Sequence, residues 1–295
     1  MNQQHFTRRR MLTGLAAGGA VLPFGWRRAA AQTPEIGEEP ETLFVVTFPR
    51  DWQPEGEAQG AYYRITLEPG QSLTYLPGPY CGCTGETIQE GTAAERVLSG
   101  TSYTVRLDRP FILRRDGGED EEVAAGTEVE LTAGDVAVYP DALAFGDLTN
   151  SGDDTIVLFG ASITSLEFNE GTFTPPLPEE MSARLSVAVW DAWQNLGGGD
   201  IDATLTRRVL PAGEALDPYE IVGLEAIHVQ SGELHSSVIH PGESTPTADP
   251  RYISPGGTVA FREQTPGTQR LLANPFEEPA VLLTLTFNGA AESNG

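Results

Sequence analysis

The chain contains no lysine: all 18 of its basic residues are arginines, and they stand against 42 aspartates and glutamates, for a formal net charge of −24. A surface this acidic repels the phosphate backbone, which argues against nucleic-acid binding. Excess negative charge is more often a means of staying soluble. Long helical periods are also missing; residues 188–196 predict a turn or two of helix at most.

Cysteine and histidine, the usual ligands of transition metals, are scarce as well. The two cysteines stand together in the segment Cys81-Gly82-Cys83. Outside the cytoplasm this pair could close a small disulfide loop. Two free thiols, a redox-active pair and half a metal site are the alternatives. Apart from His5, the histidines are His228, His235 and His240.

The N-terminus reads as an export signal. Arg8, Arg9 and Arg10 form a basic segment of the twin-arginine type, an apolar stretch over residues 12–26 follows, and residues 29–31 are Ala-Ala-Ala. This order predicts a twin-arginine signal peptide over residues 1–31, cleaved after Ala31, and a periplasmic or secreted protein that uses the twin-arginine export machinery. The alternative is an uncleaved membrane anchor, which the short, glycine-containing stretch disfavours.

The remaining 264 residues suffice for two compact domains. Residues 1–31 hold five arginines and no acid, so 13 basic and 42 acidic residues remain, a formal charge of −29. We expect an acidic leader and first strand over residues 32–58, and a tail over residues 290–295. Between them we expect barrels at residues 59–165 and 185–289, joined by a proline-rich linker at residues 166–184.

Short alternating segments separated by glycine, proline, aspartate or asparagine predict an antiparallel β-sandwich or barrel. In the first half they are residues 42–48, 61–67, 102–107, 127–131 and 155–159. In the second half, alternation resumes at residues 185–189, 203–209, 225–229, 258–261 and 280–287.

Four blocks recur in the same order in the two halves, which indicates a duplicated domain. They pair residues 65–73 with 208–216, 97–100 with 229–232, 133–138 with 256–261, and 148–154 with 272–278. The repeat keeps the turn residues and few of the residues that would carry chemistry.

These blocks resemble the cupins, and the duplication resembles a bicupin. The resemblance implies two tandem double-stranded β-helix barrels of the jelly-roll type, an all-β fold. Cupins carry the signatures G-x5-H-x-H-x3,4-E-x6-G and G-x5-P-x-G-x2-H-x3-N, whose three histidines and one glutamate bind a divalent metal in the barrel. Cupins also often pair as homodimers.

In the second half the resemblance assigns the ligand positions to Tyr219, Ile221, Glu225 and Arg270. Only the acid is kept, and a lone carboxylate beside a guanidinium is a poor site for a divalent cation. In the first half the corresponding residues are Leu76, Gly78, Ala93 and Phe145, so no ligand remains. Residues 76–94 depart most from the family pattern, and we expect Cys81, Cys83, Glu86 and Glu90 to lie in a loop over the mouth of the first barrel. Both metal sites are therefore predicted to be degenerate, with no cofactor.

Arg270 and Glu225 are expected to face each other in the second barrel, where a guanidinium–carboxylate pair would replace the metal. Together with Tyr219 they form a candidate site for a small polar or anionic ligand. A purely structural ion pair is the alternative. His235, His240 and Glu225 are the fallback ligands should a divalent metal bind after all.

The sequence thus favours an exported protein that binds a small molecule or has a structural role in the cell envelope, without catalysis. A metal-dependent dioxygenase, isomerase or decarboxylase with a non-standard ligand set is the enzymatic alternative. A thiol-redox protein that uses Cys81 and Cys83 is a third hypothesis.

Overall fold

Alternating burial organises the strands of this chain. Along Ile201–Leu210, for example, Ile201, Ala203 and Leu205 are buried while the residues between them are more exposed, as expected for a strand that covers a core with one face. The computed structural model describes residues 39–55, 58–75, 86–141, 146–168, 185–193, 199–220, 223–247, 250–262 and 267–289. Apart from one short 3-10 turn, the regular elements in these ranges are β-strands, so the fold is all-β.

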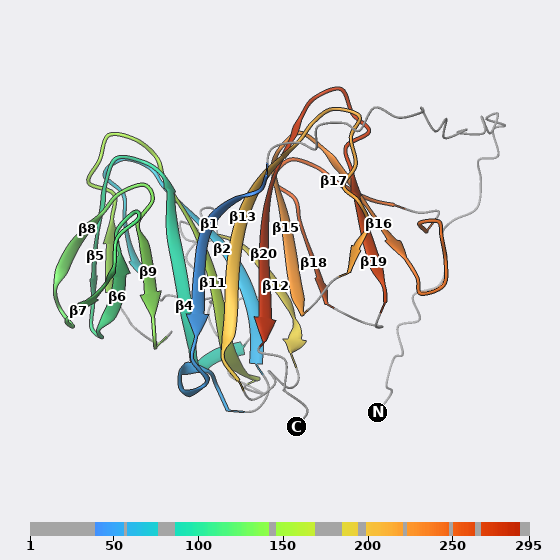
Figure 1. The fold of residues 1–295 in the computed structure, drawn as a ribbon. Helices are drawn as coiled ribbons and strands as arrows, with labels where there is room; N and C mark the ends of the chain where they lie inside the picture. Colours follow the sequence, from blue (N-terminus) through green and yellow to red (C-terminus); the bar gives the residue numbers. More distant parts are fainter. Residues whose placement is uncertain are drawn as a thin grey trace, which may run out of the picture. The chain divides into compact units, whose positions relative to one another are not determined.

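The first half of the chain forms a jelly-roll barrel from a larger and a smaller antiparallel sheet (Figure 1). The larger sheet has the order β12 (Leu185–Trp193), β2 (Ala58–Leu67), β11 (Ile156–Phe168), β4 (Glu86–Ser99), β9 (Val136–Tyr139), β6 (Phe111–Arg114) and β7 (Asp120–Val123). The smaller sheet has the order β3 (Ser72–Tyr75), β10 (Gly146–Thr149), β5 (Tyr103–Leu107) and β8 (Glu128–Leu131).

The second half repeats this plan, with no counterpart of the β6–β7 hairpin among its described residues. Its larger sheet has the order β1 (Glu41–Phe48), β13 (Ile201–Leu210), β20 (Ala280–Gly289), β15 (Leu224–Ser231) and β18 (Thr258–Arg262). Its smaller sheet has the order β14 (Tyr219–Glu220), β19 (Gln269–Ala273), β16 (Leu234–Ile239) and β17 (Arg251–Ile253). The predicted pair of tandem jelly-roll barrels is confirmed by this topology.

One asparagine motif shows that the two halves are structurally equivalent. The side-chain amide of Asn150 donates to the carbonyls of Leu67 and Asp154. The amide of Asn274 donates in the same way to Leu210, and also to Glu278. Each buried asparagine links the end of a neighbouring strand to the turn that follows the asparagine itself. This shared structural role explains why an asparagine occurs at this position in both repeated blocks.

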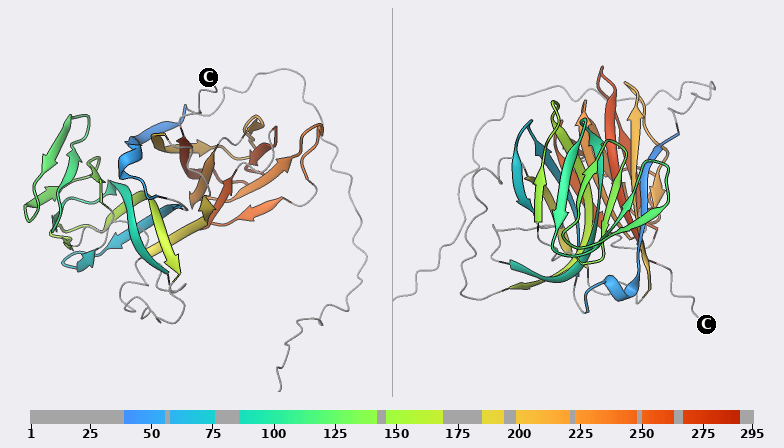
Figure 2. Two further views of the ribbon diagram at one scale, coloured as in Figure 1. Left: turned by 90° about the horizontal axis from the view of Figure 1, so that it is seen from below. Right: turned by 90° about the vertical axis from the view of Figure 1, so that its left-hand side faces the viewer.

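The halves exchange their outermost strands. Strand β1 precedes the first barrel in sequence but pairs with β13 of the second, from Glu41 opposite Arg207 to Phe48 opposite Ile201. Conversely, β12 follows the first barrel and pairs with its β2. Figures 1 and 2 show the blue β1 among the yellow-to-red strands of the second barrel. Each larger sheet is therefore completed by a strand from beyond its own repeat.

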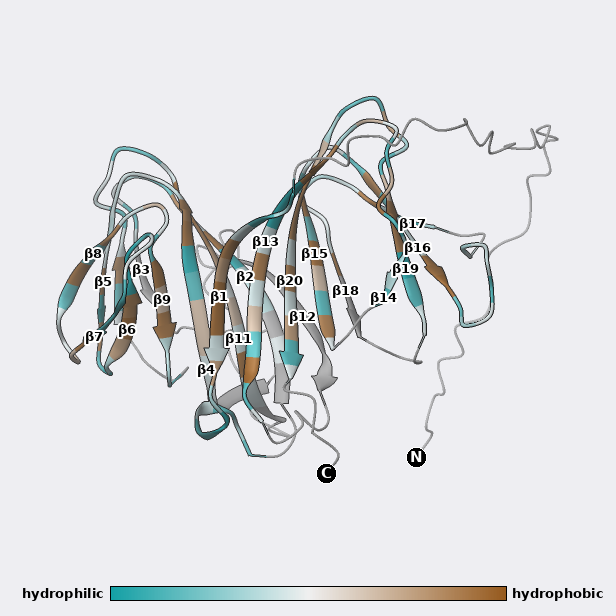
Figure 3. Cartoon of the chain, in the orientation of Figure 1, coloured by the Kyte–Doolittle hydropathy of each residue, from teal (hydrophilic) through white to brown (hydrophobic). Residues whose placement is uncertain are grey.

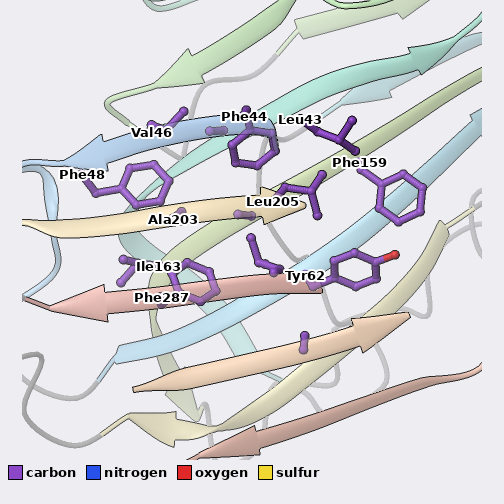
Figure 4. Close-up of a cluster of buried hydrophobic side chains, with 14 of the residues drawn as sticks. Leu43, Phe44, Val46, Phe48, Tyr62, Phe159, Ile163, Ala203, Leu205 and Phe287 are labelled. Carbon is purple, nitrogen blue, oxygen red and sulfur yellow. The ribbon is translucent and has the colours of Figure 1, made fainter. Parts of the chain in front are cut away.

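Buried apolar residues form three clusters. One fills the first barrel and includes Ile65, Val105 and Leu158; a smaller one fills the second barrel and includes Ile227, Val229 and Leu282. The third lies between the two larger sheets (Figure 4), where β1 contributes Leu43, Phe44, Val46 and Phe48 and both barrels contribute further residues, such as Phe159, Leu205 and Phe287. Figure 3 shows the same apolar segments in brown along β1, β6 and β9.

Three local predictions are wrong. Residues 188–193, assigned to a helical turn, belong to strand β12, because pairing with β2 overrides the weak helical pattern. Glu86 and Glu90, assigned to a loop over the barrel mouth, lie on β4, which extends beside β11 as far as Glu86 opposite Phe168. Strand β11 likewise runs three residues into the segment assigned to the linker.

Several sequence-based assignments lie outside the described residues. They are the signal peptide at residues 1–31, the cysteine pair, most of the linker, the tail at residues 290–295, and the positions Leu76, Gly78, Phe145 and Ile221. Within the described ranges, none of the helices is long and apolar enough to span a bilayer.

Candidate functional site

The three residues singled out in the second barrel come together. Tyr219 on β14 pairs directly with Arg270 on β19, so their side chains share one face of the smaller sheet. Glu225 on the opposing β15 alternates in phase with Ile227 and Val229, which belong to the cluster inside the barrel. The two sheets thereby aim a phenol, a guanidinium and a carboxylate at one another.

The contacts are those of a buried ion pair with one hydroxyl donor. The Tyr219 hydroxyl donates to Glu225 Oε1 at 2.9 Å. Arg270 Nε lies 3.6 Å from Glu225 Oε2, and the exposed fractions of the two charged side chains are 1% and 6%. The sequence-based expectation that Arg270 and Glu225 face each other therefore agrees with this geometry.

Burial dominates the electrostatics of this trio. It raises the pKa of the Glu225 carboxyl, although Arg270 and the Tyr219 hydroxyl act in the opposite direction. It lowers the pKa of the Arg270 guanidinium to about 10, against the pull of Glu225. The Tyr219 pKa is raised, first by burial and then by the Glu225 charge. Arg270 thus stays charged at neutral pH, whereas Glu225 takes up a proton more readily than an exposed glutamate does.

These residues do not fit the divalent metal that the resemblance implies. Such a site needs three or four nitrogen, oxygen or sulfur ligands, and here one carboxylate shares the space with a guanidinium. Among the described residues, no group of three or more histidine, cysteine, aspartate or glutamate side chains could hold a metal ion.

The fallback ligands do not assemble either. Val238 is opposite Arg270 on β16, and His235 lies three residues earlier, so it points to the other face of the sheet. There its ring packs edge-on against Tyr252 and Phe276. His240 is exposed just after β16. A metal site of His235, His240 and Glu225 is therefore not formed.

The first barrel holds a second buried polar cluster, which sequence reasoning missed. Glu95 on β4 is 1% exposed and accepts hydrogen bonds from three tyrosine hydroxyls. Tyr139 donates to Oε1 at 2.6 Å, Tyr103 to Oε1 at 3.4 Å and Tyr63 to Oε2 at 3.4 Å. Burial, followed by the Glu95 charge, raises the pKa values of Tyr103 and Tyr139 well above those of free phenols. The tyrosines therefore act as neutral donors that solvate one carboxylate.

A glycine makes room for this cluster. Gly160 on β11 lies between Tyr63 on β2 and Glu95 on β4, opposite both of them. A Cβ atom at this position would come within 2.0 Å of Tyr63 Cζ, so only glycine lets the ring lie across the strand and reach the carboxylate.

The structure also explains why Glu95 was overlooked. The backbone of Val97 bonds to Gly134 and Asp135 as that of Val229 bonds to Gly256 and Gly257, so Ala93 is the true counterpart of Glu225. Glu95 lies two residues further along, on the same face. The equivalence of Asn150 and Asn274 likewise makes Gly146, and not Phe145, the counterpart of Arg270. The signal that could have found Glu95 is its place two residues after Ala93, the aligned ligand position, because alternation puts both side chains on the same face of a strand.

Comparisons with known proteins give no sequence relative. No protein-family model matches the chain, and no curated protein sequence matches it. Among solved structures, AerE from Microcystis aeruginosa is 9% identical over 85% of this chain and 98% of its own, with a TM-score of 0.38. The 7S globulin of Momordica charantia is 11% identical over 78% and 73%, with a TM-score of 0.45. A cupin 2 conserved barrel domain protein from Leptotrichia buccalis is 13% identical over 86% and 99%, with a TM-score of 0.31. With scores and identities this low, the fold assignment rests on the sheet topology above.

Proposed function

We propose that this chain is an exported, non-catalytic binding protein whose second barrel takes a small anionic ligand at Arg270, Tyr219 and Glu225. The observation that carries the proposal is the buried ion pair in the place where the resemblance puts a metal. A guanidinium in an apolar, water-poor site is a strong anchor for carboxylates and other oxyanions.

The raised pKa of Glu225 supports a ligand of negative charge. An incoming carboxylate competes with Glu225 for the guanidinium, so binding is coupled to protonation of Glu225. Once protonated, Glu225 no longer repels the ligand and can donate a hydrogen bond to it. Affinity is therefore expected to rise as the pH falls toward the pKa of Glu225.

Calorimetric titration of residues 32–295 with acetate, benzoate and phosphate, at pH 5.5 and pH 7.5, tests the proposal. We expect binding of at least one anion, stronger at the lower pH, and a loss of at least about tenfold in affinity in Arg270→Met. Arg251→Met removes the same charge from an exposed position on β17, from which it acts on Arg270 only by Coulomb repulsion, and is expected to change affinity by less than about twofold. Tyr219→Phe, which keeps the ion pair, is expected to weaken binding severalfold. Equal affinity in Arg251→Met and Arg270→Met, or no anion bound at millimolar concentration, would contradict the proposal.

The enzymatic alternative is a metal-dependent cupin-type reaction, and metal analysis separates it from a binding protein. We expect less than about 0.1 equivalent of iron, manganese, zinc, nickel or copper in protein purified without chelators. Near-stoichiometric metal would favour the enzyme.

Export is proposed from the N-terminal sequence. Mass spectrometry of the protein from a host with an intact twin-arginine system is expected to show a chain that begins at Gln32. Retention of residues 1–31 in the cytoplasm would contradict the assignment.

A further inference from the structure

A separate pocket of about 610 Å³ lies on the outside of the first barrel. It is bordered by the 3-10 turn η1 (Arg50–Trp52), which follows the exchanged strand β1, by the β6–β7 hairpin, and by the end of β9. On β6 and β7, Ile112 pairs with Glu122, and both side chains face away from the barrel interior occupied by Leu113 and Val123. The pocket is thus distinct from both buried polar clusters.

The lining combines an apolar floor with a charged border. Trp52, Pro110, Phe111, Ile112 and Pro140 supply the apolar surface. A volume of this size with a mainly apolar lining and few polar groups is typical of small-molecule sites. The Phe111 ring packs against Tyr139, 5.8 Å between centroids, and Tyr139 is fixed by its bond to Glu95. The floor is therefore held rigid by the polar cluster inside the barrel.

The border charges leave a net negative site. Arg109 is paired with Asp141. Asp120 accepts two hydrogen bonds from Arg114, at 2.6 and 3.0 Å, and Arg114 also donates to the carbonyl of Val45. Glu122 has no ion-pair partner within the described part of the chain, so its carboxylate is uncompensated at the border of the pocket that Trp52 also lines.

We propose that this pocket binds an organic cation, a substituted ammonium ion with an apolar body. Indole is the strongest aromatic partner for a cation, and a nearby carboxylate adds attraction that neutral or anionic molecules of the same shape do not gain. The net charge of −24 attracts cations to the whole surface and raises their local concentration. This site and the anion site of the second barrel do not depend on each other.

Three probes of similar size test the charge requirement: benzyltrimethylammonium, benzyl alcohol and phenylacetate. Each is titrated at about 0.15 M salt into residues 32–295 that carry Arg270→Met, which removes the proposed anion site of the second barrel. We expect the cation to bind at least about tenfold more tightly than the alcohol, and phenylacetate to be excluded from this pocket. Equal affinity of the pocket for all three probes would overturn the proposal. So would a failure of the cation to bind at concentrations up to about 10 mM.

Matched variants place the cation in the pocket. Glu122→Gln is expected to weaken binding of benzyltrimethylammonium by about fivefold to tenfold, whereas Glu121→Gln, the same charge change on the other face of β7, is expected to leave it within about twofold. Trp52→Leu is expected to abolish binding and the accompanying quenching of tryptophan fluorescence. Glu121 and Glu122 are both exposed, so the two glutamine variants are expected to fold. Equal losses in Glu121→Gln and Glu122→Gln would mean a diffuse surface attraction and would overturn the site.

Discussion

At the scale of single residues, His228 of the second barrel packs directly against residues of the first barrel. It points away from the interior of the second barrel, as its place between Ile227 and Val229 predicts, yet it is 3% exposed. Its ring packs against Tyr62 and Phe159 of the first barrel, and Nδ1 is bonded to Thr258 Oγ1 at 2.9 Å. Burial, with a smaller contribution from Arg64, lowers its pKa to about 4.

This depressed pKa makes stability depend on pH. The unfolded chain protonates His228 near pH 6.5 and the folded chain only near pH 4, so the unfolded state binds more protons between these values. The stability contributed by neutral His228 is complete above pH 6.5 and is lost as the pH falls toward 4, by about 2–3 kcal/mol. Urea unfolding at pH 7 and pH 4.5 measures it. His228→Gln should flatten this part of the profile, and an unchanged slope in that variant would contradict the assignment.

Individual site residues could be assigned from sequence where the second barrel aligns with the family signature without a gap. Tyr219 and Glu225 could be aligned because the second barrel keeps the spacing from Gly213 to Gly232, and Arg270 could be aligned from Gly267 and Asn274. Glu95 was missed because its three donors come from β2, β5 and β9, which are far apart in sequence, and no local spacing links them. The space that Gly160 leaves for Tyr63 is likewise visible only when β11 lies between β2 and β4.

At the scale of elements, β1 matters most because it joins the second barrel's sheet while covering the cluster between the barrels. Val46 is 3% exposed within that cluster, whereas its neighbour Val45 is 45% exposed on the other face. The same substitution made at Val45 and at Val46 therefore distinguishes the effect of burial on stability from the effect of strand propensity.

Val46→Asp is expected to lower the free energy of unfolding by more than about 3 kcal/mol, because it buries a carboxylate among apolar side chains. Val45→Asp is the control and should cost less than about 1 kcal/mol. Denaturant unfolding of both variants measures the difference, and similar losses would mean that β1 does not pack between the barrels.

Several strands could be predicted from sequence, whereas the longest strand, β4, and the exchange of strands could not. Alternation identified β1, β2, β13 and β20 within a few residues. Strands of two to four residues, such as β3, β10 and β14, carry too few positions for a period to emerge. Strand β1 pairs with β13, and β12 pairs with β2. The edges of the two larger sheets are similar, and hydrophobic alternation does not determine which edge each strand joins.

At the scale of the whole molecule, the charge is the dominant property. The 42 acidic residues outnumber the 18 arginines by more than two to one, so most acids have no basic partner and repel one another. The two barrels share the cluster between their larger sheets, so this repulsion acts on one cooperative unit.

Added salt is therefore expected to stabilise the protein. Raising sodium chloride from about 10 mM to about 0.5 M shortens the Debye length from about 30 Å to about 4 Å and should raise the melting temperature by several degrees, in one transition. Differential scanning calorimetry measures both the shift and the number of transitions. Potassium chloride is the control for ion identity, and a fall in melting temperature, or two separate transitions, would contradict this account.

The exchange of strands also sets an order of events during synthesis. Phe48 pairs with Ile201, a separation of 153 residues, so β1 leaves the ribosome long before its partner exists. At about 5–20 residues per second, an apolar strand waits roughly 8–30 s with its edge open. Strand β12, by contrast, finds β2 already made. The first barrel can thus close early, while β1 stays exposed to wrong partners until the last third of the chain arrives.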